Sequence, residues 1–280
     1  MKRKDGVRLK NVDPLYEVAA HIMKDRCDSL NCIRIDIPVE PLQKYIRKQK
    51  NENDISISHL GLFLAAFVRT LAEYPQLNRF IVNKRFYQRN EIAIGMVVLQ
   101  PGTDDGETMS KMYFEKTDDI FTIQKKIDDY ISHNREAEAE NATEKILRIL
   151  KFPGVLRAGV CIIKFLDKHN LLPKSVIDMS PFHATMTITN LGSIRTNYIY
   201  HHVYNFGTTS MIFSMGQPVE VPKRKKGEIV FERCIPCGLE MDERIAHGSY
   251  FAIAFKRFAQ YLEHPELLEG PPPVVNEDCG

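Results

Sequence analysis

A carboxylate and an imidazole lie close together near the C-terminus, in the stretch DERIAHG (242–248). A carboxylate can orient an imidazole as a general base, and Glu243 can itself accept a proton if burial raises its pKa. The same two side chains can instead form a structural ion pair, because a neighbouring carboxylate favours protonated imidazole. Glu243 and His247 are therefore candidate catalytic residues, and Asp242 beside them is a candidate for substrate binding.

A hydroxyl and two further side chains come from the stretch HATMTITNLGS (183–193), which alternates strictly and predicts a strand that ends in a turn. Thr189 is a candidate for lining a pocket, although threonine is also simply a good strand former. The turn begins at Asn190, and Asn190 and Ser193 are candidates for substrate binding.

Two adjacent histidines, His201 and His202, lie in the aromatic stretch YIYHHVYNFGT (198–208). Adjacent side chains of a strand point to opposite faces, so at most one of them aims into a cleft. That one is a candidate catalytic base, an alternative to the residues of DERIAHG. The alternative is a partly buried aromatic loop at a subunit interface.

Two cysteines, Cys234 and Cys237, form the motif CIPC. A metal site needs about four ligands, and this motif supplies two. It lies in a strand pattern, whereas a redox-active pair favours a helix N-terminus. The sequence therefore predicts reduced structural cysteines and no metal.

The elements that position these residues mix strands and helices throughout. Strands are predicted at 32–38, 91–99, 183–193, 208–216 and 227–241, with the lysine-rich KRKKG as a hairpin turn before the last. Helices are predicted within 51–75, at 41–49 and 122–140, and at 249–263. This mixture predicts an α/β or α+β fold, a mixed sheet flanked by helices.

One domain is expected over 1–270, with a helical insertion at about 143–180 and a flexible tail at 271–280. The insertion is amphipathic and basic and is broken at Pro153-Gly154. We expect it to cover a pocket mouth or a neighbouring subunit. A membrane-surface helix is the alternative.

The bulk composition narrows the classes of partner. The net charge is +2, and the basic runs lack interleaved aromatic residues, so no nucleic-acid partner is expected. The sequence has no signal peptide and no apolar run long enough for a membrane span, and six cysteines are too few for a disulfide framework. A cytoplasmic location is expected.

Five motifs in order, LAEYPQLNRFI, TITNLGSI, KGEIV, MDERIAHG and HPELL, resemble one known family. They look like the catalytic domain of the acyltransferase component of 2-oxo-acid dehydrogenase complexes, whose fold is that of chloramphenicol acetyltransferase. The resemblance runs from about residue 13 to residue 270. It implies a homotrimer, or a higher assembly of trimers, with active sites at subunit interfaces. The sequence shows no lipoyl or subunit-binding domain.

The resemblance also implies acyl transfer from a coenzyme A thioester, a small-molecule substrate. An imidazole takes the proton, and the hydroxyl that matches Thr189 donates to the oxyanion. In this sequence Glu243 stands at the position of the family's catalytic histidine, and His247 at that of its supporting aspartate. The arginine that holds the aspartate has no obvious counterpart, and Tyr16, Glu17 and His21 suggest a rewired ion pair.

Two main functions follow. The first is an acyltransferase that moves an acyl group from coenzyme A, or from a carrier thioester, to an unidentified thiol, hydroxyl or amine. The second is a catalytically inactive relative that acts as a trimeric scaffold or a thioester-binding module. A protein that works at a membrane surface is a third and weaker idea.

Overall fold

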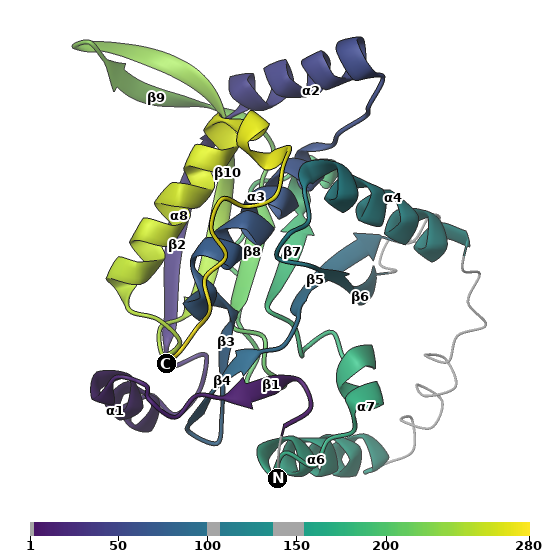
Figure 1. Cartoon of the computed structure of the whole chain (residues 1–280), viewed down its shortest axis with the longest axis vertical. Helices are drawn as coiled ribbons and strands as arrows, with labels where there is room; N and C mark the ends of the chain where they lie inside the picture. The colour runs from purple at the N-terminus through teal and green to yellow at the C-terminus, as the bar shows by residue number, and fades with distance from the viewer. Residues whose placement is uncertain (1–2, 100–106, 137–153) are drawn as a thin grey trace.

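A large mixed sheet forms the centre of the molecule (Figure 1). The computed structural model describes residues 3–99, 107–136 and 154–280. Within them seven strands form one sheet in the order β2-β10-β8-β7-β5-β6, with β9 paired to β10. The bounds are β2 Leu30–Pro38, β5 Ile92–Leu99, β6 Glu107–Phe114, β7 Met186–Asn190, β8 Met211–Met215, β9 Val219–Lys225 and β10 Glu228–Asp242. Strands β5, β7 and β8 run parallel and the other pairs are antiparallel, which confirms the predicted mixed sheet.

Helices cover one face of this sheet (Figure 1). Helix α3 (His59–Glu73) is buried from Gly61 to Ala72, and Ser58 caps it by accepting a hydrogen bond from the Gly61 N–H at 2.9 Å. Around it lie α2 (Val39–Asn53), α4 (Ile120–Glu136) and α8 (Gly248–Glu263). Their apolar sides and the inner face of β10 form one core. The helices predicted within 51–75 and at 249–263 are confirmed, although the first begins at His59.

A second, three-stranded sheet lies at one end of the molecule (Figure 1). It consists of β1 (Gly6–Arg8), β4 (Arg85–Arg89) and β3 (Arg79–Val82). The β3–β4 turn places Asn83 and Lys84 at φ 50° and 60°, the left-handed conformation that a two-residue hairpin turn requires. Helix α1 (Pro14–Ile22) begins at Asp13, whose carboxylate accepts from the Leu15 N–H at 2.8 Å.

The hairpin of β9 and β10 projects from the body of the protein (Figure 1). Its turn is Lys226-Gly227, with Gly227 at φ +92°, so the predicted KRKKG turn is confirmed. Ile229 and Phe231 on this hairpin are exposed by 72% and 70%. Exposed apolar side chains on a projecting hairpin favour contact with another chain.

The predicted helical insertion at 143–180 lies partly outside the described residues. The described part contains α6 (Val155–Lys168) and the short α7 (Lys174–Met179). Helix α6 begins after Gly154, as the predicted break requires. Leu156, Ile162 and Phe165 on α6 are more than half exposed.

The C-terminal segment differs from the flexible tail predicted for 271–280. It runs back beside α3 (Figure 1), where the Asn276 N–H donates to the Ala72 carbonyl at 2.8 Å. Asp278 forms an ion pair with Arg79, and the two side chains are only 3% and 1% exposed. The buried ion pair with Arg79 therefore orders this polar segment. The amino-acid composition of the segment, on which the prediction of a flexible tail rested, carries no information about that distant partner.

The described residues also contain three short 3₁₀ helices: η1 (Pro75–Asn78), η2 (Leu191–Ile194) and η3 (Pro265–Leu268). Helix η2 takes the place of the end of the predicted strand 183–193, so Ser193 lies in a helical turn. Every helix in the described ranges is too short or too polar to cross a bilayer.

Candidate functional site

The turn DERIAHG connects β10 to α8 and is held by a buried ion pair. The Asp242 carboxylate is fully buried and accepts from the Ser29 hydroxyl at 2.8 Å and from Arg244 Nε and Nη2, each at 2.8 Å. Arg244 Nη1 donates to the carbonyls of Met23 and Lys24, each at 3.2 Å. Asp242, predicted to bind substrate, thus has its oxygens occupied within the protein and instead fixes the turn.

His247 is held by an aromatic stack. Its ring lies 3.9 Å from that of Tyr16 between centroids, with an angle of 20° between the planes. The His247 N–H donates to the Tyr16 hydroxyl at 3.1 Å, and that hydroxyl donates to Gln76 Oε1 at 3.2 Å. The suggested rewired ion pair is absent among the described residues. Glu17 is exposed, and its carbonyl is bonded to His21.

A second ion pair lies behind this stack. Arg79 pairs with Asp278, and its Nη1 donates to the Ile245 carbonyl at 3.5 Å. The guanidinium carbon lies 5.6 Å from the centre of the Tyr16 ring. Arginine and aspartate are therefore both present near the turn, but they come from β3 and from the C-terminal segment.

Glu243 is half-buried at the start of the turn. Its N–H donates to the Ser29 carbonyl at 2.8 Å, which fixes the backbone. Its carboxylate forms no hydrogen bond or ion pair with any residue in the described ranges. The side chains of Glu243 and His247 are not joined by an ion pair, so the turn presents two separate polar groups.

Thr189 lies toward the opposite end of the central strands. It is opposite Ser214 of β8, and Ser214 is opposite Gly238 of β10. Gly238 precedes Glu243 by five residues, which is roughly 16 Å of extended strand. Thr189 and the turn therefore do not converge within one protomer.

The other predicted residues near Thr189 are on the surface. Asn190 and Ser193 are exposed, and the Ser193 hydroxyl donates to the Asn190 carbonyl at 2.6 Å. Both remain accessible to a ligand or to another protomer.

The two histidines lie in the loop before β8. His202 is exposed and His201 is half-buried, and both lie outside any strand, so the strand alternation assumed for them does not apply. His201 lies against Glu240 of β10, whose carboxylate is fully buried and forms no ion pair with any described residue. Burial raises the pKa of Glu240 to about 7, and the backbone N–H groups of His201 and Glu240 only partly offset this. No sequence pattern marks this acid, because it occupies an ordinary position in a strand.

The cysteines of CIPC are both fully buried on β10, and burial raises their pKa values. A buried thiol with a raised pKa is a poor nucleophile, which fits a structural role for Cys234 and Cys237. No group of three or more His, Cys, Asp or Glu residues in the described ranges is placed to hold a metal ion.

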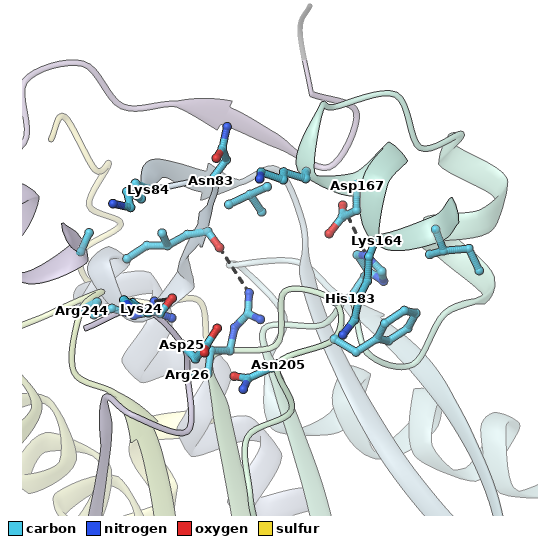
Figure 2. Close-up of a pocket in the computed structure, with 17 residues that line it drawn as sticks. Lys24, Asp25, Arg26, Asn83, Lys84, Lys164, Asp167, His183, Asn205 and Arg244 are labelled. Atoms are coloured by element: carbon cyan, nitrogen blue, oxygen red, sulfur yellow. Dashed lines mark hydrogen bonds and ion pairs between the residues drawn. The ribbon is translucent and has the colours of Figure 1, made fainter. Parts of the chain in front are cut away.

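A cavity of about 520 Å³ lies beside the turn (Figure 2). Its walls are the loop 24–26, the β3–β4 turn, helix α6 and residues 205–207, and Arg244 of the turn also lines it. Figure 2 shows Arg26 between the β3–β4 turn on one side and the side chains of α6 on the other. No sequence motif marks this cavity, because its residues come from segments far apart in the chain.

Comparisons with known proteins support the predicted resemblance. The family described as 2-oxoacid dehydrogenases acyltransferase (catalytic domain) matches residues 177–269. No curated protein sequence matches the chain.

Solved structures share the fold at low sequence identity. A probable dihydrolipoamide acetyltransferase from Listeria monocytogenes is 15% identical with a TM-score of 0.58, over 92% of this chain and 95% of that one. The cubic core of the pyruvate dehydrogenase multienzyme complex is 15% identical with a TM-score of 0.57, over 94% and 93%. A chloramphenicol acetyltransferase is 10% identical with a TM-score of 0.53, over 91% and 99%. The predicted fold class is confirmed.

Proposed function

Because residues 177–269 match the 2-oxoacid dehydrogenase acyltransferase catalytic domain and the whole chain has its fold, we propose that this protein is an acyltransferase. It transfers an acyl group from a coenzyme A or carrier thioester to a thiol, hydroxyl or amine. Residues 1–270 form the catalytic-type domain. The observation that carries the proposal is the turn after β10, which keeps a carboxylate and an imidazole at the family's two polar positions.

Glu243 is the proton acceptor in this proposal. Its carboxylate is half-buried, its backbone is fixed by Ser29, and it has no partner among the described residues. It takes the proton of the acceptor as that nucleophile attacks the thioester carbonyl carbon. The C–S bond then breaks, and the departing sulfur receives the proton from the Glu243 carboxyl.

Thr189 donates its hydroxyl hydrogen to the oxyanion that forms on the carbonyl oxygen. Thr189 and Glu243 lie at different ends of the central strands, so one protomer cannot supply both. We therefore propose a homotrimer in which Thr189 of one copy faces the turn of the next. The exposed apolar side chains of the β9–β10 hairpin support contact between copies.

The test is thiol release from acetyl- and longer acyl-coenzyme A. Glu243→Gln should lower kcat about 100-fold or more, as loss of a general base does. Glu263→Gln, an exposed carboxylate at the end of α8, is the matched control and should keep full activity. His247→Ala and His201→Ala test the two imidazoles. Wild-type rates in Glu243→Gln would rule out the assigned base.

Co-expression tests the shared site. Glu243→Gln and Thr189→Val should each be inactive alone, whereas mixed oligomers should recover activity at interfaces that join two intact residues. Mixed oligomers with no recovery would overturn the site shared between copies.

The inactive relative is the second candidate, and the stack of Tyr16 on His247 favours it, because stacking ties the imidazole to a structural role. Absence of turnover with every acyl donor, together with retained coenzyme A binding, would establish it.

A further inference from the structure

The cavity beside the turn has an excess of positive charge. Six basic residues line it: Lys24, Arg26, Lys84, Lys164, Lys168 and Arg244. Among the described residues that line the cavity, the acidic ones are Asp25 and Asp167, and Asp167 is already paired with Arg3 at 2.7 Å. Arg244 is in turn paired with Asp242. The four lysines form no ion pair with any described residue. The carboxylates of Asp242 and Asp167 act on Arg26 from beyond ion-pair distance, but the guanidinium groups of Arg244 and Arg3 act against them, so the cavity keeps its excess of positive charge.

Arg26 is the buried member of this set. Its side chain is only 6% exposed, yet it forms no ion pair in the described part of the chain. Its Nη1 and Nη2 donate to the carbonyls of Tyr204 and Ile81, each at 3.3 Å, and its Nε is buried without a partner. Burial therefore lowers the pKa of Arg26. A buried cation without a counter-ion is costly, and a bound anion removes that cost.

Lys84 is at the edge of the cavity in an unfavourable backbone conformation. Its φ of 60° lies in the left-handed region, where glycine is preferred. A lysine here keeps an ammonium group at the cavity edge. Across the cavity, Lys164 and Lys168 come from one side of α6, as Lys164 in Figure 2 shows. The charges therefore surround the cavity on several sides.

We propose that this cavity binds an anion that bears at least two phosphate charges, such as a pyrophosphate group, with Arg26 as its buried contact. A planar guanidinium binds two phosphate oxygens at once, and lysines add point charges around it. Several cations around one space fit a multiply charged anion better than a single carboxylate. The volume of about 520 Å³ lies in the range of small-molecule sites. The proposal does not depend on acyl transfer.

Calorimetric titration of the full chain with sodium pyrophosphate tests the site. Lys84→Gln combined with Lys168→Gln removes two charges at the edge and should weaken binding about tenfold or more. Lys48→Gln combined with Lys256→Gln makes the same charge change at exposed positions outside the cavity, and it should bind as the wild type does. Added sodium chloride should weaken wild-type binding.

Arg26→Gln tests the buried contact and should abolish measurable binding. Circular dichroism checks that this variant is folded, and the edge variant with its control keeps the proposal testable if it is not. No binding of millimolar pyrophosphate to the wild type, or equal affinities for the edge variant and its control, would overturn the proposal.

Competition identifies the source of the anion. Coenzyme A carries a pyrophosphate, whereas pantetheine does not. If coenzyme A displaces pyrophosphate and pantetheine fails to, the cavity holds the anionic end of the thioester. If pyrophosphate still binds in saturating coenzyme A, the site serves a separate phosphate compound. Either result supports the site, and pyrophosphate binding in a chain without turnover would separate it from the proposed function.

Discussion

The buried charges around the turn after β10 have ion-pair partners, whereas the buried charge in the cavity beside it has none among the described residues. Arg244 contributes to both regions. Around the turn, each buried charge meets an opposite one: Asp242 with Arg244, and Arg79 with Asp278. In the cavity, Arg26 is nearly as buried, but among the described residues its hydrogen-bond partners are carbonyl oxygens alone. A buried charge with an opposite partner fixes the shape of a segment. A buried charge without one is stabilised when an ion of opposite charge binds beside it.

The difference also bears on which groups can act on a substrate. The paired residues of the turn have their hydrogen-bonding atoms occupied within the protein. The Glu243 carboxylate and the ammonium groups of the cavity lysines form no ion pair with any described residue, so they are free to meet a ligand. The comparison therefore separates residues that hold the site from residues that can meet a ligand, and variants can test it at several points.

The largest expected effect comes from breaking the Arg79–Asp278 pair. Asp278→Asn leaves the Arg79 guanidinium buried and uncompensated, which should lower the free energy of unfolding by about 3 to 5 kcal/mol. Urea unfolding followed by circular dichroism measures this. The result would show that the C-terminal segment, predicted to be a flexible tail, stabilises the turn.

An exposed pair provides the control for that variant. Lys50 and Asp54 form an ion pair on α2 with side chains 55% and 88% exposed, so Asp54→Asn should cost less than about 1 kcal/mol. Equal effects of Asp278→Asn and Asp54→Asn would contradict the buried role of Asp278.

The next effect is a gain of stability on the cavity side. Pyrophosphate at about a hundredfold excess over its dissociation constant should add about 2.7 kcal/mol to the free energy of unfolding of the wild type. Thermal unfolding with and without the anion measures it, and the edge variant Lys84→Gln with Lys168→Gln should show a much smaller gain. A similar gain in both proteins would mean that the anion acts elsewhere.

Much of the fold could be predicted from the sequence because it depends on local pattern. Strand β7 alternates apolar and polar residues in MTITN, and α8 repeats apolar residues with helical spacing. The β3–β4 hairpin escaped prediction, because its turn is Asn83-Lys84 and lacks the glycine that usually marks such turns. Helix α2 was predicted too short, at 41–49, because the polar residues from Asn51 to Asn53 were assigned to the start of the next helix.

The candidate site was only partly predictable because its contacts join distant segments. The turn was recognised from its polar residues, but Arg79 and its partner Asp278 lie 199 residues apart. Arg26 lies in a polar loop, where an arginine is expected to be exposed, and its burial becomes visible only in the structure. Local pattern therefore located the turn, whereas burial decided which charges are compensated.

Glu240 tests whether an uncompensated charge on β10 also costs stability. Its pKa of about 7 in the fold lies above the ordinary value of 4.5, because the buried carboxyl is favoured in its neutral form. The contribution of Glu240 to the free energy of unfolding is therefore full below pH 4.5 and is lost as the pH rises through about 7. Between about pH 5.5 and about pH 8, the wild type should lose about 2 kcal/mol relative to Glu240→Gln. Urea unfolding of both proteins at the two pH values measures this. A difference that does not change with pH would show that Glu240 keeps its charge in the fold.

The smallest effect tests how His247 is held. Tyr16→Phe keeps the ring stack but removes the hydroxyl that links the His247 N–H to Gln76, and it should lower the free energy of unfolding by about 1 kcal/mol. Tyr16→Leu also removes the stack and should cost more. Because a stack carries no net charge, the extra loss should stay the same when sodium chloride is added, whereas an ion pair would be screened. A salt-dependent loss would mean that a charge acts on the Tyr16 ring, either from His247, as in the rewired ion pair that the sequence suggested, or from the Arg79 guanidinium 5.6 Å from the ring centre.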